Sequence, residues 1–520
     1  MSDPHHIRPD RRGALPSARR LAMAVAAAAG VALLAGPAAA HGFGQRFDLP
    51  LPLSFWVTGA GLSIVLSFAV MAIFVREGAG ERDYPRFNLL RLALFRAIAH
   101  PVVVTIIRIV AVVVFFTTMI GGFVGTQESL NNIIVPMIWV IWWVGVAFLC
   151  ALVGNVWQLI NPLRSVYRGV ERGWQLLTGQ PNLTFGVPYP RWLGAWPAVI
   201  LFAGFAWLEL VWGETDIPAS LARVMLIYSL ITWAGMLVFG RETWLRNGEA
   251  FTIAFGILAR FAPIDAPDDD NGRIMPRQLD IRPYGAGLMA YEAVTVSIFI
   301  FVMLMLSTVT FDGFIETPLY RSIQTQVFGS GLSDTLFRIS DATGFAERDI
   351  VLTVILILFP VVFALVFFIG SWIMVAVTRA FGGAGSKARE VSAGRAALAF
   401  VLTLVPIAVA YHVSHYFTYL VLQSAYVMRP LSDPFALGWN LFGTAAMSPR
   451  LGTMNPYVYW YTAVAIIIIG HVVAVFLAHI VALRVFGSRR AALVSQIPMV
   501  VLMILYTTLS LWILAQPIVG

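Results

Sequence analysis

Ten apolar stretches run along this chain, and each is close to the length that a helix needs to cross a membrane. An α-helix rises about 1.5 Å per residue, so about 20 residues cross the roughly 30 Å of hydrocarbon in a bilayer. The stretches lie at about residues 51–75, 97–124, 134–154, 194–213, 219–238, 288–312, 349–378, 396–422, 458–483 and 494–517. With 59% hydrophobic and 12% charged residues, the composition lies outside the range of soluble domains. The sequence therefore predicts an all-α, polytopic transmembrane helix bundle of about ten spans that forms a single domain over residues 41–520.

Residues 1–40 have the pattern of a cleaved secretory signal peptide. Four arginines between positions 11 and 20 precede the apolar run 21–34, and the small residues 36–40 provide an A-x-A cleavage site. Cleavage after Ala40 makes His41 the mature N-terminus, outside the cytoplasm. The α-amine and imidazole of His41 can chelate one metal ion in a geometry that suits copper. Alternatively, His41 merely follows the cleavage site.

Positively charged side chains are distributed unevenly between alternate loops. Twenty-two arginine and lysine residues lie in the loops after the first, third, fifth, seventh and ninth stretches, and six lie in the opposite set of segments of the mature chain. Because positively charged loops stay in the cytoplasm, we expect both mature termini to lie outside. The net charge of +8 is therefore a topology signal. It indicates a lipid bilayer as partner and disfavours nucleic acid.

Two loops are long enough to form structure of their own. Trp244 to Phe261 spaces Phe251, Phe255 and Leu258 at helical intervals, which predicts a helix lying along the membrane interface. On the other side, residues 315–348 predict one or two amphipathic helices. The chain lacks the G-x-S-x-G, Walker-type and H-E-x-x-H motifs, which disfavours serine-esterase, nucleotide-driven and zincin enzymes.

Histidines in the eighth and ninth stretches are the main candidates for chemistry, because ionisable groups at membrane depth are costly. His412 and His415 are three residues apart, so they share a helix face and differ in height by about 4.5 Å. His471 falls near mid-depth in the next span, where a short hairpin would bring it to the same metal ion. The sequence thus predicts a divalent metal site, copper or zinc, at His41, His412, His415 and His471. His479 lies about 12 Å further inward by helical rise, where His100 is a candidate partner in a second site or relay.

Two alternatives for these histidines stay open. Histidines on facing helices at equal depth can be axial ligands of one haem. Each histidine can also hydrogen-bond a neighbouring Tyr, Ser or carbonyl group and only tie helices together.

Charged residues inside the spans call for partners as well. Arg108 lies near the middle of the second span, so a carboxylate or a set of carbonyl groups should face it. Glu209 and Arg223 fall near the outer ends of consecutive spans, and we expect them to pair.

Several segments resemble one family of proteins. They are HGFGQRFDLPLP at His41–Pro52, Gly154-Asn155-Val156-Trp157 with Asn161-Pro162, His415-Tyr416, Ser432-Asp433-Pro434, Gly470-His471 and Ala478-His479. Through most of the mature chain the sequence resembles bacterial integral membrane proteins often labelled fenitrothion hydrolase, and the opening segment is the most specific part of the match. The resemblance implies a multi-pass protein of the bacterial inner membrane that hydrolyses an organophosphorus triester and releases a nitrophenol. It assigns no catalytic residue, so the site hypothesis rests on the histidines.

Two functional hypotheses follow. In the first, a metal held by His412, His415 and His471 activates water to hydrolyse an apolar small-molecule substrate; no carboxylate in the sequence accompanies this cluster. In the second, the chain is a metal-ion or small-solute permease, and His415, His412, His471 and His479 form a relay of falling depth. The absence of an internal repeat weakens the permease hypothesis. A third interpretation is an accessory subunit that works with a membrane protein partner or as a homo-oligomer.

Overall fold

The computed structural model describes residues 51–74, 84–266, 278–289, 294–447 and 455–516, and most of these residues are helical. Within them, nine helices are long and apolar enough to cross a membrane. These nine match nine of the ten predicted stretches. The all-α fold is thereby confirmed, and apolar helices of this number and length are typical of a multi-pass membrane protein. The remaining stretch, 194–213, contains a helix of only 15 residues, Trp196–Leu210, which is shorter than the roughly 20 residues of a full span. The predicted signal peptide and His41 lie outside the described residues.

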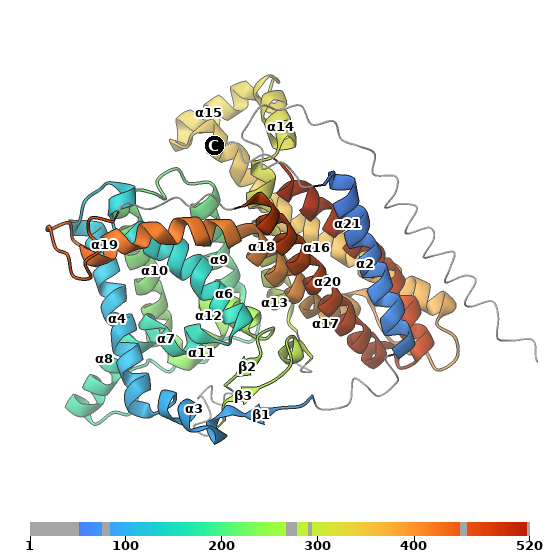
Figure 1. Ribbon diagram of the computed structural model, residues 1–520, viewed down its shortest axis with the longest axis horizontal. Helices are drawn as coiled ribbons and strands as arrows, with labels where there is room; N and C mark the ends of the chain where they lie inside the picture. The colour runs from blue at the N-terminus through green and yellow to red at the C-terminus, as the bar shows by residue number, and fades with distance from the viewer. Residues whose placement is uncertain (1–50, 75–83, 267–277, 290–293, 448–454, 517–520) are drawn as a thin grey trace, which may run out of the picture.

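Most of the helices belong to one of two groups that lie side by side (Figure 1). The first group contains α2 (Leu53–Phe74), α16 (Glu347–Phe381), α17 (Ala393–Phe400), α20 (Pro456–Phe486) and α21 (Arg489–Leu514). The second contains α3 (Ala93–Ile98), α4 (Pro101–Val124), α5 (Ile134–Pro136), α6 (Ala147–Leu152), α7 (Val156–Ile160), α8 (Pro162–Thr178), α9 (Trp196–Leu210), α10 (Pro218–Phe239), α11 (Arg241–Asn247) and α12 (Ala250–Ala259). A π-helix, Met137–Val146, connects α5 to α6.

Two helices, α13 (Val296–Ile315) and α18 (Val405–Gln423), join the groups. Helix α13 packs on α16 of the first group and on α9 of the second, while α18 packs on α20 and on the π-helix. The largest hydrophobic core lies around this junction and includes Trp143, Phe251, Phe301 and Phe400. Side chains at the junction therefore contact both groups.

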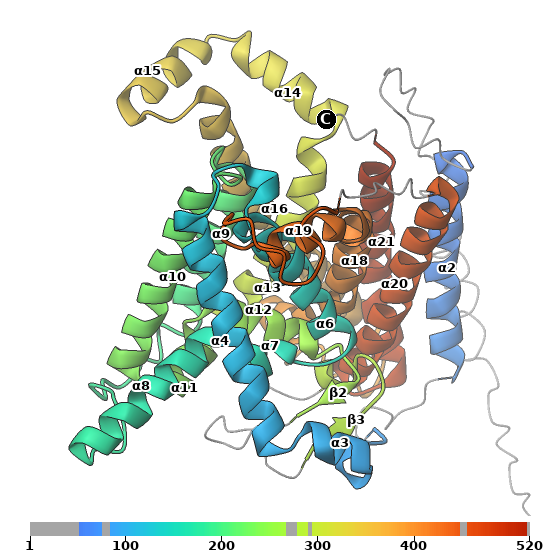
Figure 2. The same ribbon diagram turned by 60° about the vertical axis from the view of Figure 1, so that its left-hand side comes forward.

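The two ends of the bundle differ (Figure 2). One end carries α8, α11 and the turns that follow α16 and α20, and we name it the arginine-rich end. The opposite end carries α14 (Pro318–Phe328), α15 (Ser333–Thr343) and the short helix α19 (Met428–Ser432). Thus α14 and α15 provide the amphipathic helices expected for residues 315–348.

A small three-stranded antiparallel sheet lies at the arginine-rich end. Its order is β1 (Phe87–Asn88), β3 (Asp280–Ile281) and β2 (Ile264–Asp265), with Phe87 and Ile264 both opposite Ile281. The Arg282 guanidinium forms an ion pair with Asp265 at 2.7 Å and donates to the carbonyls of Ala259 and Ala262 at 3.3 Å. The sheet and Arg282 together fix the chain that follows α12.

The expectation that residues 244–261 lie along the membrane interface is wrong. Helix α12 is buried within the second group, where Phe251 and Phe255 are 2% and 0% exposed and pack against Trp142. Eight of its ten residues are buried, from Ala250 to Ala259. A helix that is apolar on nearly every face belongs in a core, and α6, α7 and α9 provide that core.

Candidate functional site

The carboxylate of Asp312 joins the two central helices. Asp312 lies near the C-terminal end of α13, and its Oδ2 accepts hydrogen bonds from His415 Nε2 at 2.9 Å and from the Tyr416 hydroxyl at 2.8 Å, both on α18. The Asp312 and His415 side chains are 24% and 21% exposed. A carboxylate hydrogen-bonded to an imidazole can hold and pass a proton.

Sequence reasoning missed Asp312, although one signal for it was present. Asp312 is the one charged residue in the run 296–315, and like His415 it lies toward the outer end of its predicted span. His415 is 103 positions away in the sequence. The sequence did not show that α13 packs against α18, so it could not bring Asp312 and His415 together.

His412 lies on the same helix one turn before His415, in an aromatic pocket. Its ring is 5.7 Å from the rings of Trp143 and Phe148 and 4.8 Å from the ring of Tyr416. The side chain is 7% exposed, and its Nε2 has no hydrogen-bond partner among the described residues. His412 thus presents a lone polar atom to a buried site, beside the Asp312–His415 pair.

Two further carboxyl groups lie near Asp312. Glu209 on α9 is half-buried beside Trp143 and Tyr416 and close enough to Asp312 for their charges to interact. The expected pair with Arg223 is not formed, because Arg223 instead contacts the Ala219 carbonyl at 3.3 Å and the Ser220 hydroxyl at 2.9 Å. We name Glu209, Asp312, His412, His415 and Tyr416 the acid–histidine cluster.

Glu316 follows α13 at the rim of this cluster. Partial loss of hydration and the neighbouring Asp312 carboxylate raise the pKa of Glu316, against the opposing effect of Arg321 and Arg348. Acidic groups therefore gather at this end of the α13–α18 junction.

The two histidines of α20 do not join the acid–histidine cluster. His471 is 1% exposed, and its ring nitrogens contact the Thr507 hydroxyl at 2.7 Å and the Ile467 carbonyl at 2.8 Å. His479 is fully buried, and its Nδ1 lies 2.6 Å from Gln496 Nε2. Both partners, Thr507 and Gln496, belong to α21, so these histidines form two separate polar contacts between α20 and α21.

The other two predicted residues lie in the second helix group. His100 precedes α4, and its Nδ1 accepts a hydrogen bond from the Val102 amide at 3.3 Å. The Arg108 guanidinium donates to the Leu159 carbonyl at 3.4 Å. His479 therefore has Gln496 as its neighbour, while His100 caps a helix.

A metal ion needs several ligands that converge. Among the described residues, no group of three or more His, Cys, Asp or Glu side chains has an arrangement that could hold a metal ion. His412 and His415 are adjacent, but both ring nitrogens of His471 already have other partners. The copper or zinc site that includes His41 stays a prediction.

No family model, no curated protein and no solved structure matches this chain.

Proposed function

We propose that this chain is a multi-pass protein of the bacterial inner membrane that couples movement of a small solute to proton binding at the acid–histidine cluster. The observation that carries the proposal is the hydrogen bond between Asp312 on α13 and His415 on α18. It lies where the two helix groups meet. A proton added to this pair changes its charge and therefore alters the contact between the groups.

Transporter architecture supports this proposal. Many permeases move one helix bundle against another around a site at the bundle interface. Paired ionisable residues inside membrane bundles commonly serve as proton relays. Two further histidines, His471 and His479, lie along α20 between the cluster and the arginine-rich end, where they contact Thr507 and Gln496 of α21. The Nε2 atom of His479 has no protein partner among the described residues.

The orientation and maturation of the chain belong to the proposal. The arginine-rich end faces the cytoplasm because it carries the positive loops. Cleavage after Ala40 and capture of an incoming metal ion by His41 also remain predictions.

Proton movement through reconstituted protein tests the permease. Proteoliposomes are loaded with a pH-sensitive dye, and small organic and inorganic anions, amines and divalent metal ions are added outside. We expect at least one solute to change the internal pH without an imposed gradient. Asp312→Asn and His415→Gln should abolish this change, because neither variant side chain carries the titratable group.

The control makes the same Asp-to-Asn substitution at a position far from the cluster. Asp341→Asn on α15 alters an exposed carboxylate and should leave solute-linked proton movement intact. Equal proton movement in wild type, Asp312→Asn and His415→Gln would show that the cluster does not couple protons to transport. No proton movement with any solute would contradict the permease itself.

Hydrolysis is the second candidate, because Asp312 provides the carboxylate that the histidine pattern lacked. A carboxylate-oriented imidazole can act as a general base on water. His415 would take a proton from water while the water oxygen attacks phosphorus, and the bond from phosphorus to the aryl oxygen would break to release a nitrophenolate. In a metal-dependent version of this step, His412 and the remaining ring nitrogen of His415 would hold a copper or zinc ion, and the ion would activate the water in place of the His415 base.

Nitrophenol release distinguishes this candidate from the permease. Purified protein is given an apolar nitrophenyl phosphotriester, with and without added copper or zinc. Hydrolysis predicts coloured product that is lost in His415→Gln and retained in His471→Gln. If wild-type protein releases no more product than empty detergent under each condition, the hydrolase candidate is wrong.

A further inference from the structure

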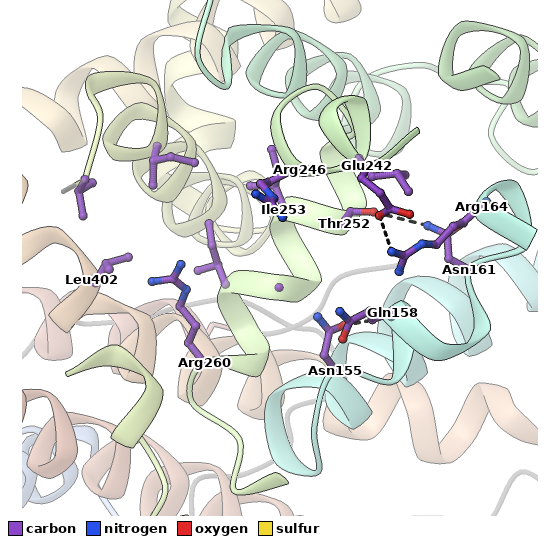
Figure 3. Close-up of a pocket in the computed structure, with 15 residues that line it drawn as sticks. Asn155, Gln158, Asn161, Arg164, Glu242, Arg246, Thr252, Ile253, Arg260 and Leu402 are labelled. Carbon is purple, nitrogen blue, oxygen red and sulfur yellow. Dashed lines mark hydrogen bonds and ion pairs between the residues drawn. The ribbon is translucent and has the colours of Figure 1, made fainter. Parts of the chain in front are cut away.

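A second polar region lies at the arginine-rich end, in a cavity of about 320 Å³. Figure 3 shows that its lining comes from α7, α8, α11 and α12, with side chains on both sides of α12. A volume of this size is within the range of small-molecule sites. None of the residues of the acid–histidine cluster lines it.

The charged lining is predominantly positive. Among the described residues, Arg164, Arg246 and Arg260 face the cavity together with one acidic residue, Glu242. Glu242 is already shared, since it forms ion pairs with Arg164 and, at 2.9 Å, with Arg241. The described part of the lining therefore carries more guanidinium groups than carboxylates.

The electrostatics of α8 agree with this excess. Burial and the neighbouring guanidinium groups of Arg172, Arg241 and Arg164 lower the pKa of Arg168, and the carboxylate of Glu242 only partly opposes them. A group surrounded by like charge is destabilised in its charged form. An anion in the adjacent cavity would relieve this repulsion.

Polar groups of the lining are held in place by the fold. Asn161 is 3% exposed; its Oδ1 accepts from the Arg164 amide at 3.0 Å, and its Nδ2 contacts the Thr252 hydroxyl at 3.4 Å. Asn155 caps α7 by accepting from the Gln158 amide at 3.1 Å. The hydrogen bonds fix the asparagine side chains at this wall, so the cavity is a built polar surface.

The remaining lining is apolar. It includes Ile253 and Ile257 of α12, Ile298 of α13 and Leu402. Gly256 also faces the cavity, and a Cβ atom there would meet no atom within 4 Å. A ligand of this cavity would thus meet guanidinium and amide groups together with hydrocarbon.

We propose that this cavity binds a phosphate monoester that carries a small apolar substituent. The guanidinium groups of Arg164, Arg246 and Arg260 in the described lining attract negative charge, and a phosphate monoester carries about −1.5 to −2 at pH 7. Guanidinium groups fit phosphate oxygens through paired N–H donors. As the solute of the permease this ligand rests on the proposed function, but its binding does not require transport.

Binding of phenyl phosphate to the full chain in phosphatidylcholine nanodiscs tests the site without any gradient. We expect saturable binding by calorimetry, with benzyl alcohol as the uncharged comparison that does not bind. Gly256→Leu should eliminate binding by filling the cavity. Gly204→Leu on α9 is the matched control, because a Cβ atom there also meets nothing within 4 Å and the residue lies outside the lining.

A second set of variants tests the role of the guanidinium groups in binding. Arg246→Gln removes an exposed guanidinium from the lining and should weaken phenyl phosphate binding about ten-fold, as expected for one charged hydrogen bond. Arg172→Gln, on α8 but outside the lining, should change affinity far less. Adding phosphatidic acid to the nanodiscs distinguishes the source of the ligand. Competition with phenyl phosphate indicates a lipid headgroup, and its absence indicates a free monoester.

Other results would overturn the inference. One is the absence of saturable phenyl phosphate binding to wild type in phosphatidylcholine nanodiscs. The other is binding that neither Gly256→Leu nor Arg246→Gln changes. Asp312→Asn should bind phenyl phosphate as wild type does. If Asp312→Asn loses proton coupling but still binds phenyl phosphate, both the acid–histidine cluster and the cavity act as proposed.

Discussion

Two carboxyl groups at the end of α13 have different surroundings. Asp312 accepts hydrogen bonds from His415 and Tyr416, whereas no hydrogen bond from a side chain to the Glu316 carboxylate is seen in the described part of the chain. Partial loss of hydration and the charge of Asp312 instead raise the pKa of Glu316. Ionisation of Glu316 therefore opposes folding.

The raised pKa of Glu316 predicts a pH effect on stability. The protonated Glu316 carboxyl group makes a favourable contribution to the free energy of unfolding. This contribution is fully present below the ordinary glutamate pKa and is lost as pH rises through the higher pKa of the folded state. In Glu316→Gln this loss is absent, so the variant should gain stability relative to wild type as pH rises through that window. Midpoints of thermal unfolding in detergent, measured against pH for both proteins, provide the check. Two parallel curves would contradict the prediction.

Close packing of α18 on α20 depends on a glycine. A Cβ atom at Gly470 would lie 2.4 Å from Ala410 Cβ and 2.8 Å from the Pro406 carbonyl oxygen. Small residues let helix backbones approach in membranes. Because the backbone of α18 cannot yield as a flexible side chain would, this contact fixes the position of the helix that carries His412 and His415.

Enlarging Gly470 should separate these helices. We expect Gly470→Leu to lower the free energy of unfolding by about 3 kcal/mol, the upper part of the range for overpacking, and to reduce the midpoint of thermal unfolding. Gly59→Leu on α2 is the control, since a Cβ atom there meets nothing within 4 Å. If both variants unfold at the same temperature, close packing at Gly470 does not stabilise the bundle.

At the scale of the whole molecule, the two ends carry different chemistry. Acidic groups and histidine gather at the end with α14 and α15, and arginines gather at the opposite end. Positive loops remain cytoplasmic during membrane insertion. The arginine-lined cavity should therefore open toward the cytoplasm and the acid–histidine cluster toward the outside.

Cysteine labelling tests this orientation. In spheroplasts of a bacterial host, a membrane-impermeant maleimide should react with Ser333→Cys on α15, and with Gly173→Cys on α8 only after permeabilisation. The native Cys150 is fully buried and should stay unlabelled in wild type. Labelling of Gly173→Cys in intact spheroplasts, with Ser333→Cys protected, would reverse the proposed topology.

The sequence alone determined the class of fold and most of the spans. Apolar runs of about 20 residues have few stable alternatives to a membrane helix, because every backbone polar group in a bilayer must be satisfied within its own segment. Caps such as Asn161 and Ser488 are local as well, since each side chain accepts from an amide three residues ahead.

Only the tertiary structure decided which polar side chains meet. Helices such as α13 and α20 are apolar on most faces, so periodicity does not show which face turns toward which neighbour. Rotation of α20 directs His471 and His479 to α21, and packing of α13 against α18 brings Asp312 to His415. For the same reason the sequence predicted the wrong position for residues 244–261, which are buried because α6, α7 and α9 pack against α12. Partners that are distant in sequence are chosen by the packing of whole helices, which no local pattern encodes.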